Sequence, residues 1–205
     1  VSPMQKLQMD TQKGKNVHVY AIKGNFDDAQ RGVKEIFGNE ALAAELEEKG
    51  YAFSSANSIN WGRLVPQIVY YCSAYTDLLE SGTVKAGEPM NVVVPTGNFG
   101  NILAAYYARE MGVPIDRLIC ASNENHVLTD FLTSGTYDRN RTFYTTASPS
   151  MDILISSNLE RLLFHLSGED DTLVRTWISA LSKDGTYTVT ADVLDKIRTI
   201  FSAAA

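Results

Sequence analysis

The feature that most constrains the fold is the β-rich run Met90–Val94, which ends in three consecutive valines and leads into a glycine-containing turn and then a helical pattern. Consecutive β-branched residues without polar alternation are typical of a strand buried on both faces of a sheet. After the turn, apolar residues recur at helical spacing from Ile102 to Met111, and a second β-rich run, Arg117–Ala121, follows. Strand, helix and strand in this order predict an α/β fold with a parallel sheet flanked by helices.

The remaining pattern predicts further strands and helices on both sides of this unit. We expect strands at 17–22, 51–53 and 141–145. We expect helices from about residue 25 to 37 and again up to Gly50, with Asn25 capping the first and Asn125 capping one near 127–134. A long helix with apolar residues from Leu64 to Leu79 either starts near Pro66 or kinks there. The C-terminal third reads as helices, the last one capped by Thr190.

Composition and charge exclude several classes of protein. Apolar residues make up 44% of the 205 residues and charged residues 20%, as in an ordinary globular domain. The net charge of -6, without a Lys/Arg block, does not suit non-specific nucleic-acid binding. No apolar run reaches the roughly 18 residues of a membrane helix. Cys72 and Cys120 stand apart and in no paired motif, so we expect a reducing, cytoplasmic location without disulfides.

The turn Pro95–Asn101 is the first candidate site. Gly97 and Gly100 permit close approach of a ligand to the backbone, and the N–H groups at a helix N-terminus attract anions, phosphate above all. The same glycines also suit a tight turn without a ligand, and the spacing alone does not decide between these two interpretations. The turn matches neither the dinucleotide fingerprint nor the P-loop.

The polar segment Asn57–Arg63 is the second candidate. Arg63 can bind a phosphate or carboxylate through two hydrogen bonds, and Asn57 and Ser58 can add others. The alternative is a capped helix start with a solvated arginine, and periodicity alone favours that alternative. No histidine has a partner at ligand spacing, so we expect no metal site.

Taken with three further segments, these two motifs resemble the threonine synthases, a family of pyridoxal 5'-phosphate enzymes of the tryptophan-synthase β-like fold (fold type II). The further segments are Lys23–Gln30, Ala121–Asn125 and Pro149–Ile153. The resemblance implies a carbon–oxygen lyase acting on phosphates, which converts O-phospho-L-homoserine and water to L-threonine and phosphate in the last step of threonine biosynthesis. It implies a small-molecule partner, and neither nucleic acid nor membrane.

The resemblance also implies roles for individual residues. The residues expected to hold the cofactor phosphate are Gly97, Asn98, Phe99, Gly100 and Asn101. Those expected to contact the substrate are Asn57, Ser58 and Arg63, with Arg63 on the phosphate side. Residues 1–53 would belong to a small cofactor-side domain and residues 54–205 to a large domain that binds the cofactor phosphate.

The chain departs from the family pattern in its missing lysine. The Schiff-base lysine of the family lies upstream in a Phe-Lys-Asp motif that this chain lacks, as it lacks the Ser-Gly-Asp-Thr-Gly loop. We therefore expect a central fragment with an incomplete sheet, no catalytic residue of its own and no activity alone. Two alternatives stay open, namely a short non-catalytic phosphate-binding homologue and a threonine-synthase-like phospho-lyase.

Overall fold

The computed structural model describes residues 3–24, 26–57 and 59–205. The chain forms two compact units, Val1–Ser54 and Ser55–Ala205. Both candidate sites lie in the second unit. Among the described residues, no helix is long and apolar enough to cross a membrane.

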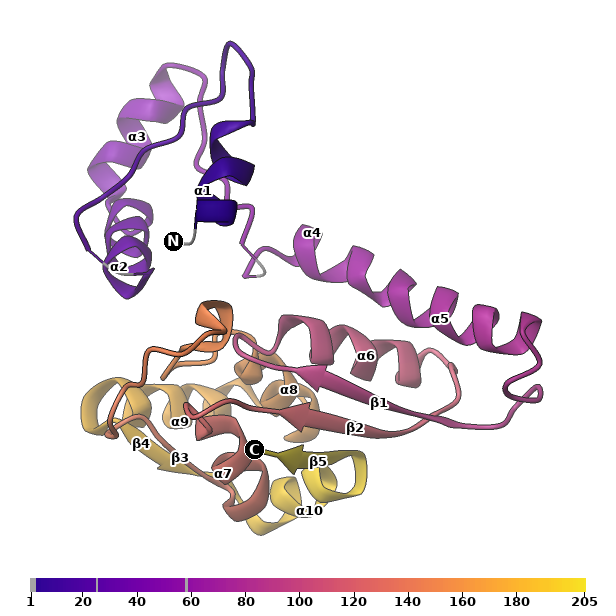
Figure 1. Cartoon of the computed structure of the whole chain (residues 1–205). Coiled ribbons are helices and arrows are strands. Elements are labelled where there is room, and N and C mark those ends of the chain that lie inside the picture. The colour runs from indigo at the N-terminus through magenta and orange to yellow at the C-terminus, as the bar shows by residue number, and fades with distance from the viewer. Residues whose placement is uncertain (1–2, 25, 58) are drawn as a thin grey trace. The chain divides into compact units, whose positions relative to one another are not determined.

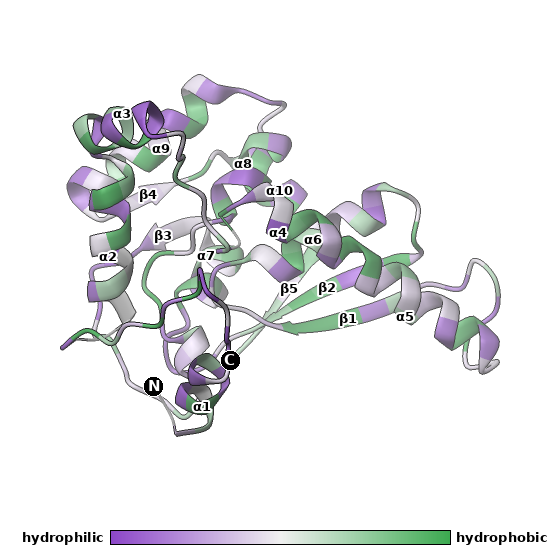
Figure 2. Ribbon diagram, turned by 90° about the horizontal axis from the view of Figure 1, so that it is seen from above, coloured by the Kyte–Doolittle hydropathy of each residue, from purple (hydrophilic) through white to green (hydrophobic). Residues whose placement is uncertain are grey.

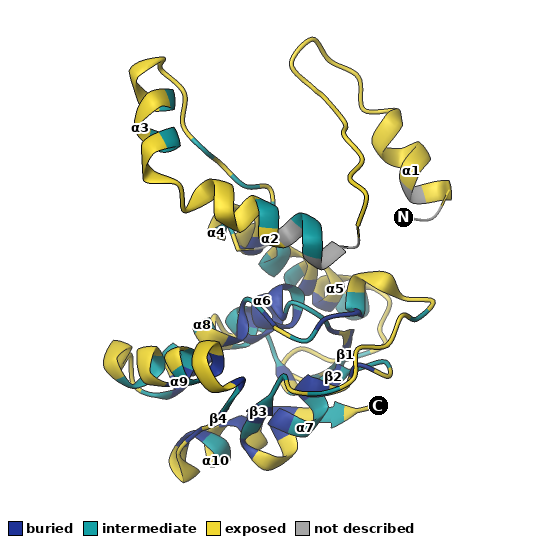
Figure 3. Ribbon diagram, turned by 90° about the vertical axis from the view of Figure 1, so that its left-hand side faces the viewer, coloured by how far each residue is buried: buried dark blue, intermediate teal, exposed yellow. Residues whose placement is uncertain are grey.

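The first unit holds helices α1 (Pro3–Asp10), α2 (Phe26–Phe37) and α3 (Glu40–Glu48), and confirms the two predicted helices after residue 25. The predicted cap Asn25 lies outside the described residues. The predicted strands at 17–22 and 51–53 are wrong, because the described residues of this unit contain no strand to which they could hydrogen-bond. Residues 17–22 are exposed along their whole length, and Figure 3 shows how little of α1 and α3 is buried.

The second unit is built on a parallel sheet of strands β1 (Met90–Pro95), β2 (Ile115–Ala121) and β5 (Phe201–Ala204), in the order β1-β2-β5. Both strand pairs are parallel, which confirms the predicted parallel sheet. The prediction that β1 is buried on both faces is wrong, because β1 lies at the edge of the sheet and Val93 is 61% exposed. The sequence analysis also missed β5.

Helices cover both faces of this sheet. In Figure 1, α6 (Gly100–Glu110) lies on one face, while α7 (Val127–Ser134) and α10 (Ala191–Ile200) lie on the other. The facing side chains Ile102, Leu118 and Ile197 are all fully buried. Figure 2 shows the hydrophobic residues gathered along β1, β2 and α6. This packing places the N-terminus of α6 directly at the carboxyl end of β1.

The other elements refine the predicted boundaries. The predicted long helix is broken at Pro66 into α4 (Trp61–Leu64), the 3₁₀ turn η1 (Val65–Gln67) and α5 (Ile68–Glu80), because proline has no N–H to donate. The C-terminal third is largely helical, as predicted. Its helical elements are η2 (Pro149–Met151), α8 (Leu159–Leu166), α9 (Asp171–Asp184) and α10.

A small antiparallel pair replaces the predicted strand at 141–145. Strand β3 (Thr136–Asp138) pairs with β4 (Thr186–Thr188), and Tyr137 stands opposite Tyr187. The two rings stack with centroids 5.5 Å apart. This buried aromatic contact favours residues 136–138 as the strand over the exposed run that follows.

Candidate anion site at the first strand–helix turn

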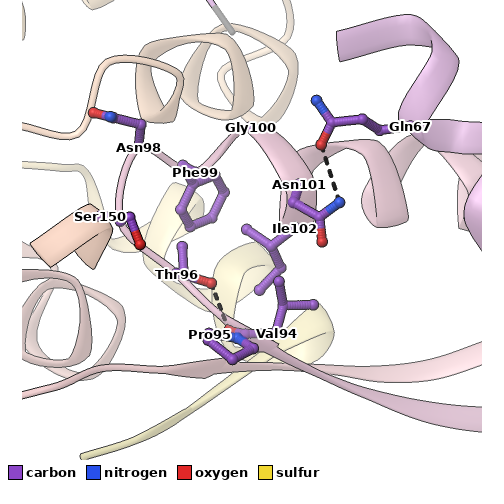
Figure 4. A pocket seen from close by; sticks show the side chains of 11 residues that line it. Gln67, Val94, Pro95, Thr96, Asn98, Phe99, Gly100, Asn101, Ile102 and Ser150 are labelled. Atoms are coloured by element: carbon purple, nitrogen blue, oxygen red, sulfur yellow. Dashed lines mark hydrogen bonds between the residues drawn. The ribbon is translucent and has the colours of Figure 1, made fainter. Parts of the chain in front are cut away.

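The turn between β1 and α6 lines a cavity of about 190 Å³. Gln67 from η1 and Ser150 from η2 complete its wall, as Figure 4 shows. The cavity lies at the carboxyl end of a parallel strand, where ligands of α/β proteins bind. The structure therefore places all five residues of the first candidate site, Gly97 to Asn101, around one cavity.

The backbone N–H groups of residues 97–102 are the donors of this site. None of them donates to another backbone group of the described residues, and the first amide to do so is that of Leu103, which donates to the Phe99 carbonyl at 3.0 Å. The amides lie in the loop directly before α6 and in its first turn, where the helix dipole adds positive potential. A group of unbonded amides at a helix N-terminus suits an anion such as phosphate.

Phe99 gives the turn its shape. Its φ of 63° lies in the left-handed region, which costs a residue with a Cβ roughly 1–2 kcal/mol. Its ring is 1% exposed and lies 5.7 Å, centroid to centroid, from that of Phe201 on β5. Burial of the ring thus offsets the unfavourable backbone conformation and keeps the turn in one shape.

The carbonyl groups of the turn are bound from the side of α8. Ser156 Oγ donates to the Gly97 carbonyl at 3.0 Å. Asn158 donates twice to the Asn98 carbonyl, from its backbone N–H at 3.1 Å and from Nδ2 at 2.9 Å. With their carbonyls held in this way, these peptide groups can present their N–H groups to a ligand. The sequence analysis missed both residues. The polar run 156–158, which directly precedes an apolar helical pattern, could have indicated them.

The Asn101 side chain is occupied by protein contacts. Its Oδ1 accepts from the Tyr71 hydroxyl at 2.7 Å, and its Nδ2 donates to Gln67 Oε1 at 3.0 Å. Figure 4 shows the side chain directed toward Gln67. Asn101 can therefore face a ligand in the cavity through its backbone N–H, while its amide group ties the turn to η1 and α5.

A neighbouring loop packs on Gly97 and explains why no side chain fits there. A Cβ on Gly97 would lie 2.9 Å from the Ser150 carbonyl oxygen and 3.3 Å from Met151 Cα, both backbone atoms. The nearby Asp152 carboxylate is buried and fixes this loop. It accepts hydrogen bonds from the Thr146 N–H and hydroxyl, and from Asn123 Nδ2 and Asn125 Nδ2.

Burial acts to raise the pKa of Asp152, but the hydrogen bonds from Thr146, Asn123 and Asn125 outweigh it and hold the pKa below its ordinary value.

The predicted capping role of Asn125 is wrong, because its side chain is used in this network and His126 occupies the N-cap position of α7. Thr190 does stand at the N-cap of α10 but makes no side-chain capping hydrogen bond.

The second candidate segment lies beside the first. Asn57 is half-buried, and its Oδ1 accepts from the Ile59 N–H at 3.2 Å. Asn60 caps α4 by accepting from the Gly62 N–H at 2.9 Å. Arg63 is exposed on α4, which leaves its guanidinium open to a ligand from solvent. Ser58 lies outside the described residues.

Comparison with solved structures shows to which known proteins this chain is related. The pyridoxal-phosphate-bound threonine synthase of Brucella melitensis matches this chain with a TM-score of 0.85 and 44% identity, over 100% of this chain and 42% of that one. This chain is a homologue of the threonine synthases. Threonine synthase-like 1 of Homo sapiens is 45% identical over 99% of this chain and 28% of the human protein. Threonine synthase of Pseudomonas aeruginosa is 41% identical over 100% of this chain and 41% of its own length.

These likenesses confirm the predicted family resemblance and the predicted α/β fold with its parallel sheet. No family model matches the chain. The chain spans less than half the length of the threonine synthases and threonine synthase-like proteins that it matches. The roles of the individual site residues stay predictions.

Proposed function

We propose that this chain forms the phosphate-binding and substrate-side part of a threonine-synthase-type enzyme that uses pyridoxal 5'-phosphate. The observation that carries the proposal is the β1–α6 turn, whose unbonded amides line a cavity in a homologue of a pyridoxal-phosphate-bound threonine synthase. An enzyme of this kind converts O-phospho-L-homoserine and water to L-threonine and phosphate.

The residues of the turn fit the cofactor phosphate. The absence of a side chain at Gly97 lets the backbone of Ser150 and Met151 pack against the turn, and the amides of Gly97, Asn98, Phe99, Gly100 and Asn101 can donate to phosphate oxygens. When bound, pyridoxal phosphate would supply the electron sink for proton removal from substrate carbon atoms. The turn's contribution is to anchor and orient that group at the end of the sheet.

The segment Asn57–Arg63 is proposed to bind the substrate. Arg63 would pair its guanidinium with the substrate phosphate, and Asn57 and Ser58 would donate further hydrogen bonds. In this role the segment holds the leaving group and orients the carbon chain. No residue of this chain is proposed as the covalent anchor of the cofactor.

The two compact units, Val1–Ser54 and Ser55–Ala205, support a division of the chain into two domains. We propose that residues 1–53 belong to a small cofactor-side domain and residues 54–205 to the large phosphate-binding domain.

The two cysteines are free thiols, which supports a reducing, cytoplasmic location.

A phospho-lyase is a second candidate, because the relatives of this chain include threonine synthase-like proteins as well as proteins named threonine synthase. Identity to the human threonine synthase-like 1, at 45%, is as high as identity to the bacterial threonine synthase, at 41%. Such an enzyme would release phosphate from O-phospho-L-homoserine or a related substrate without forming threonine.

The test is to load the native full-length protein with pyridoxal phosphate and measure threonine and phosphate formed from O-phospho-L-homoserine. Equal amounts of both support a synthase, and phosphate without threonine supports the lyase. Failure to develop the cofactor absorbance band would contradict both and leave a non-catalytic anion-binding homologue.

Arg63→Ala tests the substrate role in the same assay. Loss of a charge-assisted hydrogen bond should raise the KM for the phosphorylated substrate by about 10- to 100-fold, while the cofactor absorbance band stays unchanged. Arg175→Ala is the matched control, since Arg175 lies on α9 with its side chain 78% exposed. An Arg63→Ala enzyme with unchanged kinetics would reject the assignment.

A further inference from the structure

The phosphate-binding turn and the substrate-side segment are joined by a contact that neither motif contains. Asn158, which precedes α8 and is 0% exposed, binds the Asn98 carbonyl through both its backbone N–H and Nδ2. The other polar atom of its side chain, Oδ1, accepts a hydrogen bond from Arg161 Nη1. Asn158 therefore anchors Arg161 to the turn.

Arg161 reaches from this anchor to the substrate-side segment. Its Nη2 donates to the Ile59 carbonyl at 2.6 Å. Its guanidinium carbon lies 5.8 Å from the centroid of the Trp61 ring, a distance at which a cation is attracted to an indole. One planar guanidinium thus contacts the backbone of the segment, an aromatic ring of the segment, and the residue that holds the turn.

The chemistry of the guanidinium suits this position. Its donors have a fixed, fork-like arrangement, so two acceptors bound to it are held at a fixed separation. A lysine ammonium keeps the charge but lacks the planar fork. The spacing between the Ile59 carbonyl and the Asn158 side chain therefore depends on an arginine at residue 161.

A second, independent contact joins the same two regions. Gln67 Nε2 donates to the Arg63 carbonyl at 2.7 Å, and Gln67 Oε1 accepts from Asn101 Nδ2 at 3.0 Å. The segment is thus held near its start by Arg161 and at its end by Gln67.

We infer that Arg161 is a positioning residue, which fixes the segment Asn57–Arg63 relative to the turn Gly97–Asn101. This inference rests on the proposed function, because it takes the segment as the substrate side and the turn as the cofactor side. Arg161 contacts neither ligand in this scheme and acts through the backbone at Ile59.

The first test needs no cofactor. Amide hydrogen exchange is measured in the cofactor-free native full-length protein for wild type, Arg161→Lys and the control Arg175→Lys. We expect about tenfold faster exchange across residues 57–63 in Arg161→Lys, the size that loss of one charge-assisted hydrogen bond gives, with exchange in α9 unchanged. Unchanged exchange at 57–63, or equal acceleration in α9, would overturn the inference.

The second test uses the loaded enzyme. Arg161→Lys should raise the KM for O-phospho-L-homoserine about tenfold, with kcat within about twofold of wild type and a normal cofactor absorbance band. Gln67→Met cuts the second contact without changing a charge and should also raise the KM. An unchanged KM in Arg161→Lys, or a lost cofactor band in it, would overturn the positioning role.

Failure of the proposed function looks different from failure of this inference. It would be seen in the wild-type protein itself, as an absent cofactor band or an absent reaction with O-phospho-L-homoserine. A wild type that binds the cofactor and turns over, beside an Arg161→Lys variant that behaves identically, rejects the inference alone.

Discussion

At the scale of single residues, buried polar groups determine how the candidate site is held. Asp152 and Asn158 are 5% and 0% exposed, and each makes several hydrogen bonds to loops distant in sequence. A buried polar group that loses its partners costs more free energy than the hydrogen bond contributes. Substitutions at these positions should therefore lower the free energy of unfolding strongly.

Asp152→Asn should lower the free energy of unfolding at pH 7 by about 1–3 kcal/mol, because its NH2 group would face the Thr146 N–H or, in the flipped orientation, the Asn123 and Asn125 donors. The pKa of Asp152 is lowered in the folded state. Its carboxylate therefore stabilises the fold fully at pH values above the unfolded-state pKa of about 4, and this stabilisation is lost as the pH falls through the folded-state pKa. The difference from wild type should therefore shrink below about pH 4.

Urea unfolding over a pH series measures this difference. The exposed Asp171 on α9 provides the control Asp171→Asn, which should stay close to wild type throughout. A difference at pH 7 that persists unchanged in acid would contradict the role of the Asp152 carboxylate.

Cys120 should be chemically inert in the folded protein. Burial raises the pKa of its thiol to about 11, against the opposing effect of hydrogen bonds with Thr96 and Ser122. We expect iodoacetamide at pH 8 to leave Cys120 unmodified until the protein is unfolded, because the thiolate is the reactive form. Peptide mass mapping measures the extent of alkylation at Cys120. Rapid labelling of Cys120 in the native protein would contradict its burial.

At the scale of elements, the site depends on contact between the β1–α6 turn and the loop through η2. Gly97 lies under the backbone of Ser150 and Met151, where a Cβ would come within 2.9 Å of the Ser150 oxygen. Contacts this close to backbone atoms are relieved only by movement of one of the two loops.

Gly97→Ala should therefore displace the turn and weaken binding of pyridoxal phosphate by about tenfold or more, a size expected for the loss of one or two hydrogen bonds to a charged group. Titration of the cofactor-free protein, followed by absorbance, gives the Kd. Gly32→Ala is the matched control, since a Cβ there meets nothing within 4 Å. Equal cofactor affinity in the two variants would contradict the proposed phosphate site.

At the scale of the whole molecule, the sheet of the second unit has β1 and β5 as its edge strands within the described residues. Strand β1 lies at one edge and presents Val93 to solvent, with 61% of the residue exposed. An apolar edge strand is a template for pairing with another chain.

The 205-residue chain alone should therefore self-associate as its concentration rises, and Val93→Lys should reduce this association. Sedimentation velocity measures both. Val69→Lys on α5 is the control, because Val69 is equally exposed, at 62%, but lies on a helix. Equal effects of the two lysines would show that general surface hydrophobicity, and not the strand edge, drives association.

Sequence reasoning could predict those parts of the fold and site that local pattern encodes. The run Met90–Val94, the turn after it and the helix that follows are contiguous, so one stretch of chain specifies a strand, a glycine-containing turn and a helix. The family resemblance added the grouping of Asn57–Arg63 with this turn, which residue periodicity alone did not favour.

What the tertiary structure decided depends on contacts between residues far apart in the chain. Phe201–Ala204 becomes a strand because β2 offers it hydrogen bonds, while the more β-rich residues 17–22 form none, because the described residues of their unit hold no strand to pair with. Asn158, directly before α8, and Arg161, in its first turn, contact the site in the same way. Local periodicity records which face of an element is apolar, but backbone pairing and buried hydrogen bonds are decided only when distant segments meet.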